Sequence, residues 1–289
     1  MLYLNRNERL APLPGWFVEK IRQSIESDLF TKYPVTEVLY GNLSKALALP
    51  SDRILPTAGS DAAIKAIYHV YVERGSTVLV LDPSYAMYPI YAAMFGAQIK
   101  SIPFDRDMSI DRNLLLSSIT SGVSLVMLAN PNQPTGSTLD DDFIRHIASA
   151  ANETGTLVAI DEAYFPFSQS TCLRLVEECE NVVITRSFSK AYGFAGLRLG
   201  FAAANPAIIK NLFKVRSAYD VNSFAILCAN CILQHPEVVN EYVVQVEEGG
   251  AVLSAIAVAL GLTPLPVCTN FMLIRVAHRC PPSRLVEAL

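Results

Sequence analysis

The feature that most constrains the fold is an alternation of short apolar runs with longer segments of helical periodicity. The apolar runs are rich in β-branched residues and span residues 77–82, 124–130, 156–163, 181–187 and 198–204. Continuous apolar runs of this length are typical of strands buried on both faces of a sheet. Between them, segments such as 61–75 and 140–155 carry apolar residues at helical spacing and end on glycine. The alternation predicts an α/β fold with a mostly parallel central sheet and helices on both faces.

The chain of 289 residues is longer than one average domain. After about residue 206 its pattern becomes mainly helical, and a further strand is predicted over residues 269–276. This change of pattern predicts a second, smaller domain.

Composition argues against several classes of protein. The net charge of −4 and the lack of a basic run argue against nucleic acid as the main partner. The mean hydropathy is +0.30, but the longest uncharged stretch, residues 249–274, is interrupted by Pro264, Pro266 and Asn270. It therefore predicts a buried helix, a turn and a strand rather than a membrane span. The first ten residues lack the apolar region of a signal peptide, so we expect a cytoplasmic protein.

The cysteines and histidines predict no metal site. The six cysteines are scattered, at positions 172, 179, 228, 231, 268 and 280. Cys228 and Cys231 form a Cys-x-x-Cys pair in an apolar helical segment, but a zinc ribbon would need a second pair. The four histidines show no ligand spacing. We therefore expect buried thiols in a reducing cytosol.

Polar and aromatic side chains follow the predicted strands. In open α/β sheets ligands bind outside the carboxyl ends of the strands. The segments at those ends are "PSYAMY" (83–88), "PNQPTG" (131–136), "DEAY" (161–164) and "TRSFSK" (185–190), and "TAGSD" (57–61) precedes a predicted helix. One rim of the sheet would thus gather aromatic rings, amides, a carboxylate, a lysine and a helix N-terminus.

The helix that follows Gly59 and Ser60 is a candidate phosphate site. A helix N-terminus presents free backbone N–H groups and the positive end of the helix dipole. Ser187 and Ser189 add hydroxyl donors, and Arg198 adds a charged fork of donors. Taken alone, the Gly-Ser pair also fits a plain helix N-cap.

Asp161 and Lys190 each follow an apolar strand. A carboxylate in that place is costly unless it has a partner, so Asp161 is either a strand-end cap or a group that holds a positive nitrogen. A desolvated lysine near other cations loses its proton readily and becomes a nucleophile, and the apolar and small flanks of Lys190 argue against an ordinary surface lysine. Pyridoxal 5′-phosphate is a cofactor that needs a phosphate cradle, an amine nucleophile, a buried carboxylate and an aromatic platform together.

The combination "NPNQPTG", "DEAY" and "SFSKAYGFAGLRLGF" resembles the pyridoxal-phosphate-dependent aminotransferases of the aspartate aminotransferase superfamily, fold type I. Within that superfamily, the chain is most similar to the histidinol-phosphate aminotransferases, and the resemblance extends from "LNRNERLAPLP" to "NFMLIRV". It implies an enzyme that moves an amino group between an amino-acid-like donor and a 2-oxo acid, with histidinol phosphate and 2-oxoglutarate as the leading pair.

The resemblance also implies a role for each motif residue. Lys190 matches the lysine that links covalently to the cofactor and Asp161 the partner of its pyridine nitrogen. Tyr164 matches the tyrosine that bonds the cofactor's 3-hydroxyl, and Tyr85 the ring that stacks on the pyridine. The phosphate cradle matches Ala58, Gly59, Ser60, Ser187 and Arg198, with Ser189 beside them. Tyr33 matches a tyrosine that reaches the phosphate of the neighbouring subunit, which implies a homodimer with shared active sites.

Two departures from the family pattern stand out. The family reads "NNPTG", whereas here Gln133 takes the place of the asparagine before proline and Asn132 precedes it. Either amide could bond the 3-hydroxyl, and we favour Asn132 because the longer side chain would have to fold back. The arginine that binds the substrate carboxylate in relatives would follow Leu289, which leaves Arg6, Arg216 and Arg275 as candidates.

The resemblance divides the chain into three parts. Residues 1–30 are expected to form an N-terminal arm and part of the small domain, residues 31–206 the large cofactor-binding domain, and residues 207–289 connecting helices with an incomplete α+β small domain. Other functions remain open at this point: a phosphothreonine decarboxylase, a specialised-metabolite aminotransferase, and a truncated pseudoenzyme that only binds the cofactor.

Overall fold

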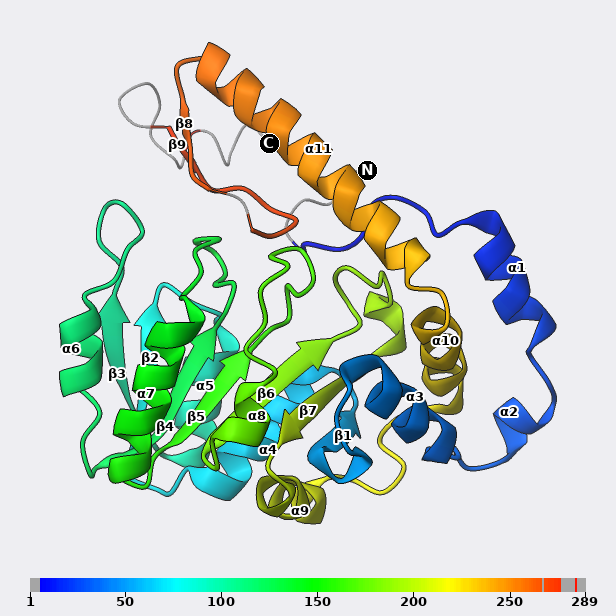
Figure 1. Cartoon of the computed structure of the whole chain (residues 1–289), viewed down its shortest axis with the longest axis horizontal. Coiled ribbons are helices and arrows are strands. Elements are labelled where there is room, and N and C mark those ends of the chain that lie inside the picture. Colours follow the sequence, from blue (N-terminus) through cyan, green and yellow to red (C-terminus); the bar gives the residue numbers. More distant parts are fainter. Residues whose placement is uncertain (1–5, 267, 277–283, 285–289) are drawn as a thin grey trace.

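A seven-stranded sheet forms the centre of the computed structural model, which describes residues 6–266, 268–276 and 284 (Figure 1). Its strands are β1 (Ile54–Thr57), β2 (Thr77–Asp82), β3 (Gln98–Pro103), β4 (Val123–Ala129), β5 (Leu157–Asp161), β6 (Val182–Ser187) and β7 (Gly200–Ala204). They lie in the order β1-β7-β6-β5-β4-β2-β3. β7 runs antiparallel to both of its neighbours, β1 and β6, and the other neighbouring pairs are parallel. The prediction of a mostly parallel α/β sheet is confirmed.

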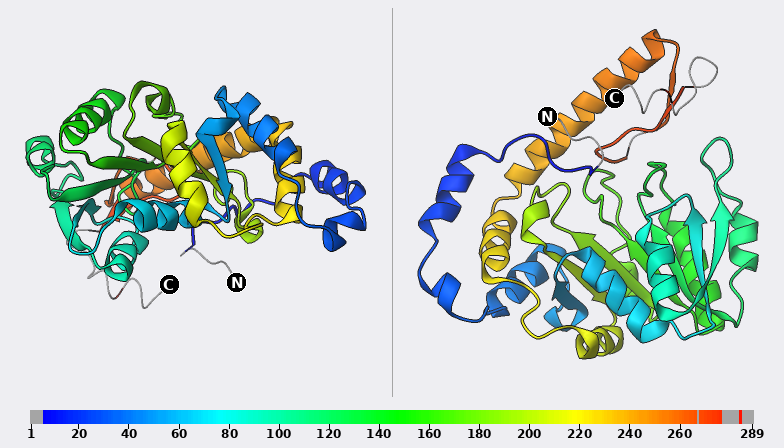
Figure 2. Two further views of the ribbon diagram at one scale, coloured as in Figure 1. Left: turned by 90° about the horizontal axis from the view of Figure 1, so that it is seen from below. Right: turned by 180° about the vertical axis from the view of Figure 1, so that it is seen from behind.

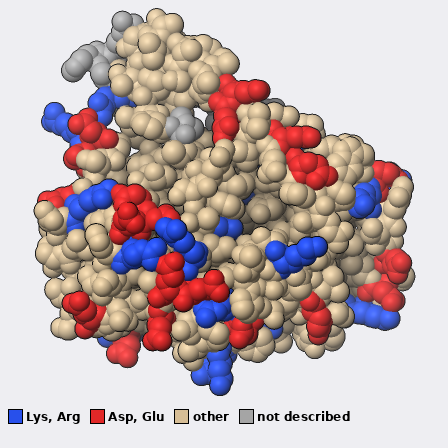
Figure 3. Space-filling model, in the orientation of Figure 1, with Lys and Arg blue, Asp and Glu red and all other residues tan. Residues whose placement is uncertain are grey.

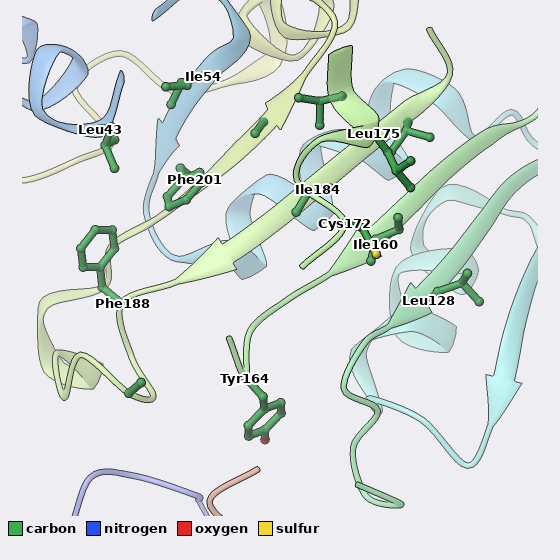
Figure 4. Packing of buried hydrophobic residues seen from close by; sticks show 14 of the residues in the cluster. Leu43, Ile54, Leu128, Ile160, Tyr164, Cys172, Leu175, Ile184, Phe188 and Phe201 are labelled. Atoms are coloured by element: carbon green, nitrogen blue, oxygen red, sulfur yellow. The ribbon is translucent and has the colours of Figure 1, made fainter. Parts of the chain in front are cut away.

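Side chains of the central strands are buried on both faces of the sheet. In β4, Leu125 and Met127 join the apolar cluster on one face, whereas Val126 and Leu128 join the cluster on the other. Figure 4 shows Leu128, Ile160 and Ile184 of neighbouring strands within that second cluster. Burial on both faces explains why these strands appear in the sequence as continuous apolar runs.

Helices cover both faces (Figure 2). One face carries α4 (Ser60–Tyr71), α5 (Met87–Phe95) and α9 (Pro206–Val215). The opposite face carries α3 (Glu37–Leu47), α6 (Arg112–Ser117), α7 (Asp141–Glu153) and α8 (Leu175–Glu178). The same apolar cluster extends beside the sheet to α1 (Gly15–Gln23), α10 (Ser223–Leu233) and the first half of α11 (Glu237–Ala259). The short helices α2 (Asp28–Thr31), η1 (Ser51–Arg53) and η2 (Ala195–Leu197) lie in connections.

Capping residues mark where several helices begin. Asp140 accepts a hydrogen bond from the backbone N–H of Phe143 at the start of α7, and Asn222 accepts one from Ala225 at the start of α10. These side chains satisfy N–H groups that have no partner within the helix.

The two edge strands, β1 and β3, were absent from the sequence prediction. β1 contains Pro56, which cannot donate to a neighbouring strand and is tolerated at an edge. β3 is mostly exposed and carries Lys100. Neither strand shows the continuous apolar run that marks the strands of the sheet centre.

The C-terminal part of the structure extends away from the sheet. α11 projects beyond the sheet, and β8 (Thr263–Pro264) pairs with β9 (Ile274–Arg275) alongside it (Figures 1 and 2). The strand predicted over residues 269–276 is thus only two residues long.

The prediction of a buried helix in residues 249–274 was wrong, because the second half of α11 is largely exposed. Val252 and Val258 are 61% and 60% exposed, although β8 packs alongside the helix. By length and composition alone α11 could cross a membrane. Its first half, however, packs Val239, Tyr242 and Val243 into the protein core, which favours a protein-packed helix.

Candidate active site

A pocket lies where the carboxyl ends of β4, β5 and β6 meet the N-terminus of α4. Of the residues predicted for the site, the pocket brings together Ser60, Tyr85, Gln133, Asp161, Tyr164, Ser187, Ser189, Lys190 and Arg198. The polar groups meet there because parallel strands end at the same edge of the sheet. On the molecular face shown in Figure 3, positive and negative side chains are interspersed rather than gathered into a basic field.

Asp161 ends β5 and is 5% exposed. Its two carboxylate oxygens accept hydrogen bonds from the Tyr88 hydroxyl and the Thr185 hydroxyl, each at 3.0 Å. Burial raises the pKa of Asp161 to about 6, and the two hydrogen bonds oppose that shift. A carboxylate held in this way favours a positively charged N–H group as a partner, because a nearby cation would stabilise its ionised form.

Lys190 lies in the turn that follows β6. Phe188, two residues earlier, is buried and anchors the turn, and Gly193 donates to the Lys190 carbonyl at 3.0 Å. The Lys190 Nζ donates to the backbone carbonyl of Arg6 at 2.8 Å and lies 5.6 Å from the centre of the Tyr164 ring. Burial lowers the pKa of Lys190 and the charge of Arg198 adds to this, whereas the charges of Glu8 and Asp161 oppose it. The lowered pKa favours the neutral, nucleophilic amine.

Tyr164 connects the pocket with the loop after β4. Its hydroxyl donates to Gln133 Oε1 at 3.0 Å and accepts from Asn7 Nδ2 at 3.0 Å. Burial raises the pKa of Tyr164 to about 12. The phenol therefore stays protonated at neutral pH and acts as a donor.

Our preference for Asn132 over Gln133 is not supported by this arrangement. Asn132 is buried, and its amide donates to the Pro83 carbonyl in the loop after β2 at 3.0 Å and to the Thr135 hydroxyl in its own loop at 2.8 Å. Ser84 donates to its amide oxygen at 2.7 Å. Gln133 is the amide that borders the pocket, because the Asn132 side chain is fully used in joining its loop to the loop after β2.

The predicted phosphate cradle forms around the start of α4. Gly59 precedes the helix with φ +84°, and a Cβ there would lie 2.8 Å from an Arg198 guanidinium nitrogen. A Cβ on Gly200, at the start of β7, would lie 2.3 Å from the backbone nitrogen of Ser60. The two glycines thus allow the arginine and the neighbouring strand to approach the helix N-terminus.

The hydroxyls of Ser187 and Ser189 complete this cradle. The Ser187 hydroxyl accepts from the backbone N–H of Ser189 at 3.0 Å, and Arg198 Nη1 lies 3.4 Å from the Ser189 hydroxyl. Ala58 lies beside the cradle in sequence but does not line the pocket. Hydroxyls, a guanidinium and a helix N-terminus together form a set of donors suited to a phosphate.

Three tyrosines spaced three residues apart face two carboxylates, and sequence reasoning found only the first of them. Tyr88 donates to Asp161, and Tyr91 donates to Asp61 at 2.8 Å. Tyr85 packs edge-on against Tyr88, with ring centres 5.4 Å apart, and burial raises its pKa to about 12. The repeated spacing in "YAMYPIY" was the available signal for Tyr88 and Tyr91.

Tyr33 lies away from this pocket. It is 74% exposed and stacks on Tyr219, with ring centres 4.3 Å apart. Within this single chain it has no role in the site.

Two of the three arginines considered for the substrate carboxylate also lie elsewhere. Arg216 pairs with Asp220 at 3.6 Å, and Arg275 pairs with Asp107 at 3.7 Å and donates to the Arg106 carbonyl. Arg6 reaches the pocket through its backbone carbonyl, which accepts from Lys190.

Within the described part of the chain, no group of three or more His, Cys, Asp or Glu residues is arranged to hold a metal ion. The five cysteines described there are free thiols. The prediction of buried thiols holds for Cys172 and Cys228 and was wrong for Cys179, Cys231 and Cys268, which are partly exposed. Cys280 lies outside the described residues.

The pocket can bind a planar cofactor that carries a phosphate and a ring nitrogen. The donors around Ser60 and Arg198 suit the phosphate, and the buried Asp161 carboxylate suits a protonated ring nitrogen. Lys190 lines the same pocket and supplies an amine nucleophile. Pyridoxal 5′-phosphate fits this set of groups.

Comparison with known proteins identifies the family. Aminotransferase class I and II is the family that matches, over residues 17–279. The chain is 34% identical over 279 residues to the histidinol-phosphate aminotransferase of Chlorobium luteolum, covering 95% of this chain and 77% of the relative. It is 32% identical over 276 residues to the enzyme of the same name from Thermoanaerobacter sp. strain X514, covering 94% and 78%.

Solved structures share the fold. The histidinol-phosphate aminotransferase of Sinorhizobium meliloti, in complex with pyridoxal-5′-phosphate, superposes with a TM-score of 0.84 at 27% identity, covering 93% of this chain and 74% of that one. Aspartate aminotransferase from Thermus thermophilus with maleate superposes with a TM-score of 0.86 at 20% identity, covering 98% and 80%, and shows the fold alone.

Proposed function

This chain belongs to the class I and II aminotransferase family, and we propose that it is a pyridoxal-5′-phosphate-dependent aminotransferase of the histidinol-phosphate type. The observation that carries the proposal is the meeting of Lys190, Asp161 and a set of phosphate donors in one pocket. The relatives named histidinol-phosphate aminotransferase support this type of donor. We propose 2-oxoglutarate as the acceptor.

Each residue of the pocket has a defined task in this proposal. Pyridoxal 5′-phosphate, when bound, supplies an electron sink next to the α-carbon of the donor. Lys190 moves a proton to and from that carbon as general base and then acid, aided by its lowered pKa. Asp161 holds the proton of the ring nitrogen, and Tyr164 donates a hydrogen bond toward the ring oxygen. Gln133 takes the place that we first assigned to Asn132.

Tyr85 is proposed to stack on the cofactor ring. The phosphate would be held by the backbone from Ala58 through Ser60 and by the side chains of Ser60, Ser187, Ser189 and Arg198. This set excludes bulk water from the charged end of the cofactor, because the Ser187 and Ser189 side chains are largely buried.

We also propose a homodimer with shared active sites. Tyr33 is exposed together with Phe30, Val35, Val38 and Tyr219, all of which are more than half exposed. A surface of neighbouring large apolar side chains is typical of a protein–protein interface. In a dimer, Tyr33 would reach the phosphate of the neighbouring subunit. The division into residues 1–30, 31–206 and 207–289 belongs to the same proposal.

The test combines cofactor trapping with turnover. We expect the purified protein, loaded with pyridoxal 5′-phosphate and reduced with borohydride, to carry the cofactor on the peptide that contains Lys190. Lys190→Ala should abolish the adduct, whereas Lys210→Ala, which removes an exposed lysine on α9, should leave it intact. Histidinol phosphate and 2-oxoglutarate should support turnover. An undiminished adduct in Lys190→Ala would contradict the cofactor assignment, and turnover with other donors alone would contradict the substrate type.

A further inference from the structure

The N-terminal segment, residues 6–11, lies against the pocket, although it is far from the pocket residues in sequence. The Arg6 carbonyl accepts from Lys190 at 2.8 Å, and the side chain of the next residue, Asn7, donates to the Tyr164 hydroxyl at 3.0 Å. Two consecutive residues of one segment thus contact the two pocket groups that the proposed function assigns to proton transfer and to the ring oxygen.

Asn7 determines how the Tyr164 hydroxyl can act. A phenol has one proton to donate, and here it points to Gln133 Oε1 at 3.0 Å on the pocket side. The Asn7 amide approaches the phenol oxygen as a donor, so it occupies a lone pair and leaves the proton directed toward the pocket. The hydrogen bond from Asn7 also lowers the pKa of Tyr164, against the larger upward effect of burial. A phenol that accepts one hydrogen bond becomes a stronger donor of its own.

The backbone of Asn7 has a left-handed conformation and is held by a hydrogen bond from the C-terminal part of the chain. Its φ is +52°, a left-handed conformation that asparagine tolerates better than most residues. Its backbone carbonyl accepts from Asn270 Nδ2 at 3.0 Å, and Asn270 precedes Phe271, whose ring lies 5.1 Å from the Tyr164 ring. In Figure 4 the Tyr164 ring points away from the sheet, toward the N-terminal and C-terminal chain segments.

Arg9 anchors the same segment two residues further on. Its guanidinium donates to the Val238 carbonyl at 3.2 Å and lies 4.1 Å from the centre of the Tyr242 ring on α11. It also packs against Gly193, where a Cβ would lie 2.6 Å from the Arg9 Cδ atom. The segment therefore joins the turn that carries Lys190 to the start of α11.

We propose that Asn7 is a positioning residue, which directs the Tyr164 hydroxyl toward the cofactor ring oxygen by occupying its outer lone pair. This inference rests on the proposed function, because the ring oxygen belongs to the cofactor assigned there. Asn7 itself does not touch the reacting atoms; it acts through the phenol and through the backbone that leads to Arg6.

A double-mutant cycle tests this role. The variants are Asn7→Gly, Tyr164→Phe and the double variant, and Asn7→Gly keeps the left-handed backbone while it removes the amide. Gln169→Gly is the matched control, because Gln169 also has a left-handed backbone, with φ +53°, and its amide donates to Glu247 outside the pocket. The main measurement is the pH midpoint of the cofactor absorbance in the loaded protein.

A donor to the ring oxygen stabilises its deprotonated form and lowers the midpoint, so a weaker donor raises it. We expect Asn7→Gly to raise the midpoint by about half a unit to one unit, the equivalent of one ordinary hydrogen bond. Tyr164→Phe should raise the midpoint at least as far, and the double variant should match Tyr164→Phe because Asn7 then has no phenol to act on. Gln169→Gly should match the original protein. An unchanged midpoint in Asn7→Gly, or a double variant that exceeds Tyr164→Phe by the increment of Asn7→Gly, would overturn the proposal.

A second measurement uses the unloaded protein, so it does not depend on the cofactor assignment. Amide hydrogen exchange of residues 6–10 should be faster in Asn7→Gly and in Tyr164→Phe than in Gln169→Gly. Equal exchange in all three would overturn the contact itself. Failure of the borohydride adduct in the original protein, with the exchange result intact, would count against the proposed function and not against the contact between Asn7 and Tyr164.

Discussion

Replacing Asp161 with asparagine tests the chemical centre of the proposal. Asp161 is 5% exposed and is bonded by two donors, the hydroxyls of Tyr88 and Thr185, both at 3.0 Å. An asparagine fits the same space, but its NH2 group cannot accept a hydrogen bond, so one of the two donors loses its acceptor. More importantly, a neutral amide cannot hold the ring nitrogen of the cofactor in its protonated state.

The expected loss follows from the energy of that interaction. A hydrogen bond to a charged group contributes about 1.5–3 kcal/mol, and each 1.4 kcal/mol in the barrier changes a rate tenfold. Loss of this bond alone predicts a rate of amino-group transfer about ten to one hundred and fifty times lower in Asp161→Asn. Loss of the positive charge that serves as the electron sink should lower the rate further.

The assay is a single turnover, in which loaded enzyme is mixed with the amino donor and the cofactor absorbance is followed. Thr185→Val is the control, because it removes one donor to Asp161 and leaves the carboxylate. We expect the control to lose less than Asp161→Asn, with both variants retaining the fold by circular dichroism. A loss below tenfold in Asp161→Asn would refute the reasoning and would leave Asp161 as a structural cap of its strand.

Three further predictions concern the pocket and its support. Burial raises the pKa of Asp161 from 3.8 to about 6, so between these values the folded unloaded protein retains a proton that the unfolded chain releases. The free energy of unfolding should therefore fall by up to about 3 kcal/mol as the pH rises from about 4 to about 6. Denaturant titrations at several pH values should show this fall in the original protein but not in Asp161→Asn, and the same pH dependence in both proteins would contradict it. Gly59→Ala should weaken cofactor binding about five- to thirtyfold, since the new Cβ would meet Arg198 and the left-handed backbone would be strained; a fluorescence titration with an unchanged Kd would count against the cradle. Glu162→Gln should lower the free energy of unfolding by about 3–5 kcal/mol, because Glu162 forms a buried ion pair with Arg186 at 2.8 Å, and a loss below about 1 kcal/mol would show that the pair is dispensable.

Much of the fold and part of the candidate site could be predicted from local features of the sequence. The central strands were recognisable because burial on both faces demands continuous apolar runs, as in residues 182–184 before Lys190. Lys190 and Asp161 stood out because a charged group at the end of such a run needs a reason to be there. The edge strands β1 and β3 were not recognisable in this way: β1 is buried but only four residues long and contains Pro56, and β3 is mostly exposed.

The remaining features depend on contacts between residues that are distant in the chain. The sequence alone determined which residue types reach the rim of the sheet, because strand periodicity is a property of neighbouring residues. Only the tertiary structure decided that Gln133 rather than Asn132 borders the pocket, since the Asn132 amide is bonded to the loop that contains Pro83 as well as to Thr135. It also decided that Tyr88 bonds Asp161 and that Asn7 bonds Tyr164, 157 positions away. Such hydrogen bonds require the packed arrangement of several elements at once, and no periodicity along the chain encodes them.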